Sequence, residues 1–103
     1  MSESSFIGYV GDADFHDGRI LNAVKSDNSA HVRIRGGSGQ IFVVIFDGVS
    51  AMRARCAEGM MLYALAEVTC DPPLRRFVFL NWDENEESQL EVEALNISTI
   101  VEE

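Results

Sequence analysis

The chain has few of the residues that metal clusters, disulfide frameworks and nucleic-acid contacts require. Its two cysteines, Cys56 and Cys70, belong to no Cys-x-x-Cys pair, so we expect neither a zinc cluster nor a disulfide framework. We expect both to be buried as small apolar side chains. Eight Lys and Arg residues against 17 Asp and Glu residues give a net charge of −9, which excludes general nucleic-acid binding.

Long apolar runs are also missing. No run approaches the roughly 20 residues that a membrane-spanning helix needs, and residues 1–5 contain no basic region followed by an apolar stretch. We therefore expect a cytoplasmic protein that does not enter a membrane. The length of 103 residues predicts one domain, within which residues 1–14 could form a loose N-terminal arm.

Alternation of apolar and polar side chains predicts an all-β fold. His31–Arg35 and Leu90–Ala94 both alternate with a period of two, which is typical of half-buried strands. We expect seven or eight antiparallel strands in a meander that curls into a barrel or a small sandwich. The expected strands cover residues 6–10, 19–25, 30–35, 40–46, 49–55, 61–69, 75–82 and 89–101, the last bent near Leu95, with an acidic turn at 83–87.

Residues 50–68 leave two structures open. They include Ala, Met, Arg, Leu and Glu, which favour a helix, although Gly59 would cost about 1 kcal/mol in its interior. The Asp47-Gly48 pair is instead a strong hairpin signal and favours a returning strand. We expect two strands here with a break near Gly59, and a minor helix remains the alternative.

The two glycine-bearing turns predict a register for the strands that they join. A two-residue turn at 47–48 places Phe42 opposite Arg53, and the loop at 36–39 places Arg33 opposite Phe42. One face then holds a predicted core layer, composed of Val32, Ile34, Ile41, Val43, Ile45, Met52 and Ala54. The other face holds the arginine patch, which we define as Arg33, Arg35, Arg53 and Arg55 around an exposed Phe42.

Such a patch could bind a carboxylate, a phosphate or a flat ligand, because guanidinium groups bond anions and stack on planar rings. A structural role competes with this interpretation. Glu91 and Glu93 share one strand face and could neutralise the arginines within the same molecule.

The segment Asp12–Asp17 contains the residue types of a metal site. In an extended segment Asp12, Asp14 and His16 would project to one side with Asp17 nearby, and such ligands suit Mn, Fe or Zn. Short polar side chains that bond their own backbone explain the same residues. The segment has one histidine and no visible second half of a site, so we expect no bound metal or other cofactor.

Several short motifs resemble those of small bacterial β-domains, some of which look like immunity proteins of toxin systems. The motifs are Phe15-His16-Asp17-Gly18, Phe46-Asp47-Gly48-Val49, Gly59-Met60, Leu62-Tyr63 and Phe77-Val78-Phe79. The resemblance covers roughly residues 15–100 and implies a small, acidic, cytoplasmic binding protein. It supplies no catalytic residue.

These observations favour a non-enzymatic interaction module that binds a protein partner through a sheet face or edge. The acidic C-terminal half, which carries eleven of the 17 acidic residues, suits a basic partner. The alternatives are a small-anion or small-ligand binding domain that uses the arginine patch, and a metal-dependent enzyme that uses Asp12–Asp17. An edge strand could also pair with a second copy of the chain.

Overall fold

The computed structural model describes residues 5–83 and 87–102. Within them the chain forms nine antiparallel strands and one short 3₁₀ turn, with no α-helix, so the all-β prediction is confirmed. The strands are β1 (Phe6–Val10), β2 (Gly18–Ser26), β3 (Ser29–Arg35), β4 (Ile41–Asp47), β5 (Ala51–Arg55), β6 (Met61–Val68), β7 (Arg75–Asn81), β8 (Gln89–Ala94) and β9 (Asn96–Glu102), and the 3₁₀ turn η1 is Ala13–Phe15. Residues 84–86 of the predicted acidic turn, and residues 1–4 of the predicted arm, lie outside this description.

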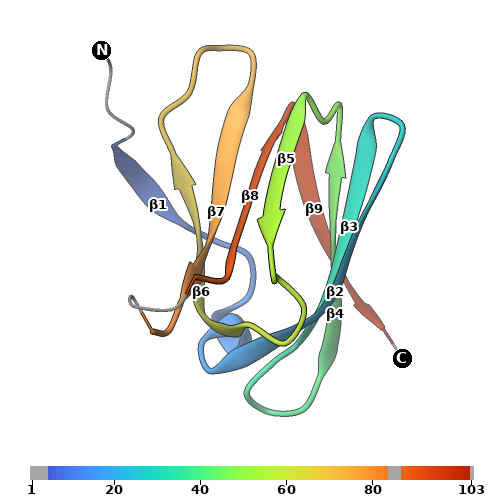
Figure 1. Ribbon diagram of the computed structural model, residues 1–103, viewed down its shortest axis with the longest axis vertical. Helices are drawn as coiled ribbons and strands as arrows, with labels where there is room; N and C mark the ends of the chain where they lie inside the picture. The colour runs from blue at the N-terminus through green and yellow to red at the C-terminus, as the bar shows by residue number, and fades with distance from the viewer. Residues whose placement is uncertain (1–4, 84–86, 103) are drawn as a thin grey trace.

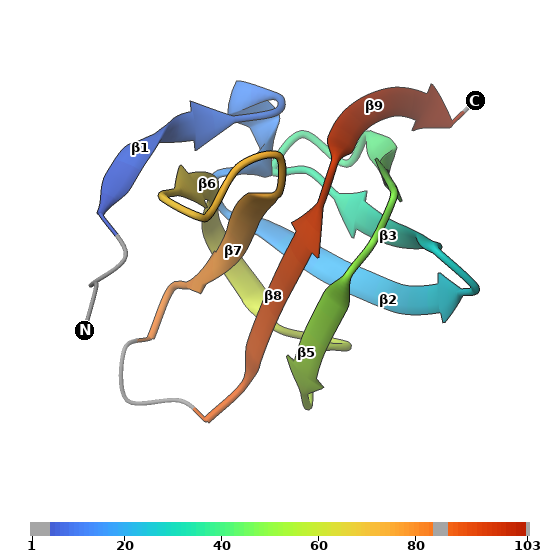
Figure 2. The same cartoon turned by 90° about the horizontal axis from the view of Figure 1, so that it is seen from above.

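Two three-stranded meanders build the molecule (Figures 1 and 2). The first half contains β2, β3 and β4 with β9 at its edge, and the second half contains β6, β7 and β8 with β5 at its edge. β1 pairs with β6, and β2 joins the halves through the pairs Gly18–Leu62 and Arg19–Met61. The single sheet is curled so that its halves face one another, and it does not close into a barrel.

The chain crosses between the halves at Asp47-Gly48, so the predicted two-residue hairpin there is wrong. β4 pairs with β3 and β9, whereas β5 pairs with β8. Gly48 has a φ of +66°, and Leu95 lies beside it at the bend between β8 and β9. A Cβ on Gly48 would lie 2.7 Å from Leu95 Cδ1. Thus β4–β5 and β8–β9 form two long strands that bend together.

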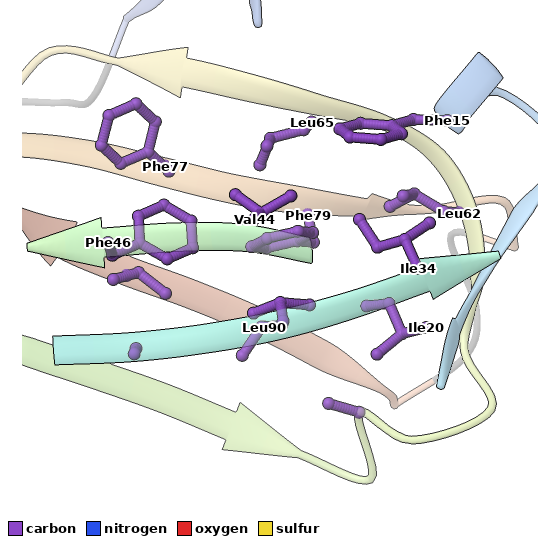
Figure 3. Packing of buried hydrophobic residues seen from close by; sticks show 14 of the residues in the cluster. Phe15, Ile20, Ile34, Val44, Phe46, Leu62, Leu65, Phe77, Phe79 and Leu90 are labelled. Carbon is purple, nitrogen blue, oxygen red and sulfur yellow. The ribbon is translucent and has the colours of Figure 1, made fainter. Parts of the chain in front are cut away.

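The core lies between the two halves and is aromatic at its centre. Phe46 of β4 packs on Phe77 and Phe79 of β7, with ring centroids 5.4 and 6.0 Å apart (Figure 3). Ile20, Leu62 and the rest of the buried cluster surround these rings. Apolar side chains from both halves are removed from water here, and this burial is the main term that stabilises the fold.

The register predicted for the loop at 36–39 is also wrong, by one residue. Arg33 faces Val43, and Ile34 faces Phe42. The shift turns every side chain of β4 to the other face. Phe42, Val44 and Phe46 are therefore in the core, whereas Ile41, Val43 and Ile45 face outward. Of the predicted core layer, Val32 and Ile34 are buried in the core, and Val43 is buried on the outer face. Met52 and Ala54 lie on the core side, opposite Val92 and Leu90.

Residues 50–68 contain two strands with a break around Gly59, as expected, and no helix. Cys56 and Cys70 are free thiols. The expectation that both are buried is wrong for Cys56, which is exposed where β5 ends and the backbone takes a φ of +49°, and Cys70 is only half-buried. Across the described residues, no helix has the length and apolar character needed to traverse a bilayer.

Candidate functional site

The five residues of the predicted arginine patch do not come together. Phe42 is 4% exposed and packs edge-on against Phe15, with ring centroids 5.2 Å apart, so it is a core residue. Arg33 and Arg35 lie on β3 in the first half, whereas Arg53 and Arg55 lie on β5 in the second half. The prediction failed because the loop at 36–39 was assigned the wrong register and because β4 and β5, on either side of Asp47-Gly48, do not pair with each other.

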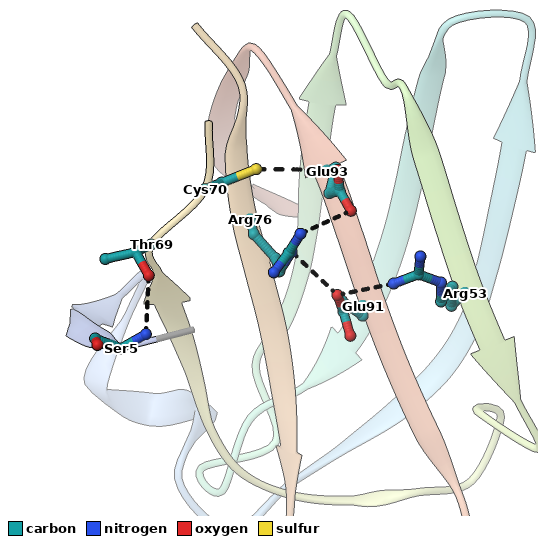
Figure 4. Close-up of polar contacts among 7 residues, drawn as sticks. All are labelled: Ser5, Arg53, Thr69, Cys70, Arg76, Glu91 and Glu93. Carbon is teal, nitrogen blue, oxygen red and sulfur yellow. Dashed lines mark hydrogen bonds and ion pairs between the residues drawn. The ribbon is translucent and has the colours of Figure 1, made fainter. Parts of the chain in front are cut away.

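Acidic side chains neutralise part of this charge within the molecule. Glu91 pairs with Arg53 on the neighbouring strand, as the structural alternative expected, and with Arg76 on the other side, both at 3.3 Å (Figure 4). Glu93 accepts a bond from Arg76 at 3.3 Å and faces the Cys70 thiol at 3.9 Å. This charged face of the second half is therefore an internal network.

Arg33 makes a similar pair in the first half. Its guanidinium donates to both carboxylate oxygens of Glu102 on β9. These hydrogen bonds raise the pKa of Arg33 and lower the pKa of Glu102. The pair spans β4, which lies between the two strands, and so ties the edge strand to the meander.

The side chains of Asp12 and Asp14 in the Asp12–Asp17 segment are turned to different partners. Residues 13–15 turn as η1 and are not extended as assumed. Asp12 caps this turn by accepting from the Asp14 N–H at 2.8 Å, and Asp14 accepts from the backbone and hydroxyl of Ser38 at 3.0 and 2.7 Å. No cluster of three His, Cys, Asp or Glu side chains with metal-binding geometry occurs in residues 5–83 and 87–102.

The same segment instead helps to build an exposed row of rings, which we call the aromatic strip: Phe6, Tyr9, Tyr63, His16 and Trp82. Tyr63 of β6 lies at its centre. Its ring centroid is 6.4 Å from that of Tyr9, 5.1 Å from His16 and 5.5 Å from Trp82. Phe6 extends the row beyond Tyr9 at 4.9 Å. Tyr9 is 61% exposed and Trp82 is 45% exposed, so these rings face solvent and not the core.

Hydrogen bonds fix the orientation of two of these rings. Trp82 donates from Nε1 to Asp17 Oδ1 at 2.8 Å. His16 donates from Nδ1 to the Tyr63 carbonyl oxygen at 2.9 Å, because a carbonyl can only accept. The β6 strand is irregular between Leu62 and Ala64, where its register with β7 shifts. Leu62 and Leu65, on either side of this irregularity, are both buried, and Tyr63 between them is exposed.

The neighbouring Tyr63 phenol affects the ionisation of Tyr9. The pKa of Tyr9 is raised, first because a charged Tyr63 phenolate nearby would repel a second phenolate, and then by partial burial and a side-chain hydrogen bond to Tyr63. The two phenols are thus neighbours in the strip, on strands β1 and β6.

Hollows border the strip on both sides of Tyr63. One, of about 330 Å³, lies against Tyr9, Phe15 and His16. A second, of about 650 Å³, lies against Trp82 and the end of β7, and a third, of about 430 Å³, reaches from Trp82 to Met61. The charged residues that line them are Asp12, Asp83 and Glu58, with no lysine or arginine among the described lining residues.

This surface combines apolar rings with a negative border. Aromatic faces attract cations, and large rings with polar handles are the side chains that most often anchor protein interfaces. The guanidinium of Arg19 on β2 is already bonded to the Gly59 carbonyl oxygen and the Met61 sulfur. The arrangement suits basic side chains that lie over rings.

Sequence reasoning did not identify this strip. No prediction placed Trp82 or Tyr63 in a binding site. The available signal was the sequence Met61-Leu62-Tyr63, in which exposed apolar side chains flank a buried leucine. The comparison with protein-family models, with curated proteins and with solved structures gave no match. The similarity to bacterial immunity proteins therefore stays a prediction.

Proposed function

We propose that this protein is a non-enzymatic interaction module that binds a basic segment of a protein partner on the aromatic strip. Its role would be of the immunity-protein kind, in which binding itself is the activity. The observation that carries the proposal is the continuous row of solvent-facing rings around Tyr63, bordered by carboxylates. We place this activity in the cytoplasm, where Cys56 and Cys70 would stay reduced as the free thiols of the structure.

Two further observations support this surface over the others. Arg53 and Arg76 of the second half are engaged with Glu91 and Glu93, so the charged face there is already paired within the molecule. The net charge of −9 also steers a basic partner toward the molecule as a whole. Large exposed apolar patches are rare on monomeric proteins, and where they occur they usually mark an interaction site.

The single tryptophan of the chain makes the strip directly observable. Trp82 fluorescence can be titrated with a synthetic peptide in which arginine and lysine alternate with leucine and which contains no aromatic residue. We expect a saturable change in intensity or wavelength that weakens with salt, because screening reduces attraction between exposed charges. A peptide of the same length with glutamate in place of the basic residues should produce no saturable change.

Variants separate the strip from the rest of the surface. Tyr63→Ser removes the central ring and should weaken binding about tenfold or more, as expected when an anchor worth at least 1.4 kcal/mol is lost. Val24→Ser is the matched control, because Val24 is also exposed but lies on the outer face of β2. Equal responses to both peptides, or equal losses in both variants, would contradict the proposed site.

A further inference from the structure

The free edge of β9 is the least protected edge of the sheet. β9 pairs with β4 over seven residues without a bulge, and its other edge has no strand partner among the described residues. Its sequence, Asn-Ile-Ser-Thr-Ile-Val-Glu, contains neither lysine nor proline. An exposed, regular and β-branched edge of this length is a template for pairing with another strand.

The other two edge strands carry protective features that β9 lacks. β5 is five residues long and exposes Arg53 and Arg55. β1 is also five residues long and is interrupted by a register shift between Phe6 and Gly8. Short length, exposed charge and bulges all discourage pairing between edges. The contrast singles out β9.

Both faces of β9 near its end expose apolar side chains. Ile100 on the outer face and Val101 on the core side are each 52% exposed. The charge on this strand, Glu102, is already paired with Arg33 of the same molecule. A neighbouring strand could therefore cover apolar surface without burying an unpaired charge, which would be costly.

The β9 sequence is complementary to itself when two copies run antiparallel about a two-fold axis at Thr99. The axis is perpendicular to the joined sheet, so the outer face of β9 in one copy lies beside the outer face of β9 in the other. Ile97 faces Val101, Ser98 faces Ile100, and Asn96 faces Glu102, so like charges never oppose each other and all seven residues are paired. Axes at the neighbouring residues leave part of the strand unpaired. Cross-strand neighbours of this kind stabilise a sheet.

We propose that a second copy of this chain occupies the β9 edge, forming a two-fold dimer in which the first halves of both molecules make one continuous eight-stranded sheet. This surface is separate from the aromatic strip, so the dimer would display two strips. An interface confined to one pair of strands is small. The dissociation constant is therefore expected in about the micromolar range.

Sedimentation velocity over a concentration series tests the dimer. The average mass should rise toward twice that of the monomer as concentration increases. Ser98→Lys with Ile100→Lys places lysines opposite one another only in the dimer, and should leave the protein monomeric throughout. The matched control is Val24→Lys with Ser26→Lys, which adds the same charge at exposed positions of β2 and should dimerise like the wild type. A wild type that is monomeric throughout, or a dimer that survives the β9 lysines, overturns the proposal.

Cross-linking tests the register even if the lysine variant folds poorly. In a Cys56→Ser, Cys70→Ser background, Thr99→Cys places two thiols across the axis, where directly opposed Cβ atoms lie about 5 Å apart. Mild oxidation should produce a covalent dimer. Ile100→Cys should cross-link more slowly, because its equivalents are diagonal neighbours. Faster cross-linking at position 100, or none at position 99, refutes the axis at Thr99.

Discussion

Replacing Phe46 with alanine should remove the side chain that holds the two halves together. Phe46 is fully buried and contacts the rings of Phe77 and Phe79 across the interior. Truncation of a buried phenylalanine costs about 3–5 kcal/mol, from lost transfer free energy and from the cavity left behind. Because both ring contacts are also lost, we expect Phe46→Ala to lower the free energy of unfolding by about 4 kcal/mol. The total free energy of unfolding of a domain of this size is roughly 5–15 kcal/mol.

The neighbouring residue provides the control for this measurement. Ile45 faces outward and is only partly buried, so Ile45→Ala should cost about 1 kcal/mol. Phe46→Leu should lie between the two, at about 1–2 kcal/mol, because leucine refills much of the space. Urea unfolding followed by circular dichroism gives all three free energies. If Ile45→Ala is as destabilising as Phe46→Ala, the faces assigned to β4 are wrong.

Three further substitutions test other contacts. Gly48→Ala should destabilise the protein by about 2 kcal/mol in urea unfolding, because its positive φ and the adjacent leucine both oppose a Cβ. Glu67→Gln should cost about 1 kcal/mol at pH 7, since it breaks the paired hydrogen bonds to Arg75 that lower the pKa of Glu67. That stabilisation is present above the ordinary glutamate pKa and is lost as pH falls through the lower pKa of the folded state. Tyr63→Phe should lower the pKa of Tyr9 toward its usual value, as followed by ultraviolet absorbance during alkaline titration.

Each of these outcomes has a result that would contradict it. Gly39 has a φ of +97° but open space around it, so Gly39→Ala should destabilise the protein by only about 1 kcal/mol. If Gly39→Ala and Gly48→Ala are equally destabilising, the contact with Leu95 does not contribute at Gly48. If the difference in free energy of unfolding between wild type and Glu67→Gln does not decrease in acid, the ionised Glu67 carboxylate is not the source of the stabilisation. Tyr9 is the one remaining tyrosine in Tyr63→Phe. If its pKa is unchanged in this variant, Tyr63 is not the cause of the raised pKa.

Predicting the candidate site from the sequence was harder than predicting the strands. Its rings come from β1, the turn after η1, β6 and the residue after β7. Tyr9 and Trp82 are brought together only because β6 pairs with β1 on one side and β7 on the other. The irregularity in β6 beside Tyr63 has no marker residue such as glycine or proline. The arginine patch, by contrast, was predicted from three segments that follow one another in the sequence and were assumed to pair in that order.

The order of amino acids alone determined which segments are extended and where the chain turns. Alternating side chains in β3 and β8, and the turn residues between segments, act through local backbone preferences that need no distant partner. The tertiary structure decided which strands pair and which face of β4 is buried. The run Ile-Phe-Val-Val-Ile-Phe is apolar on both faces, so its pattern cannot distinguish them. Only the packing of Phe46 against β7, far along the chain, selects the inner face.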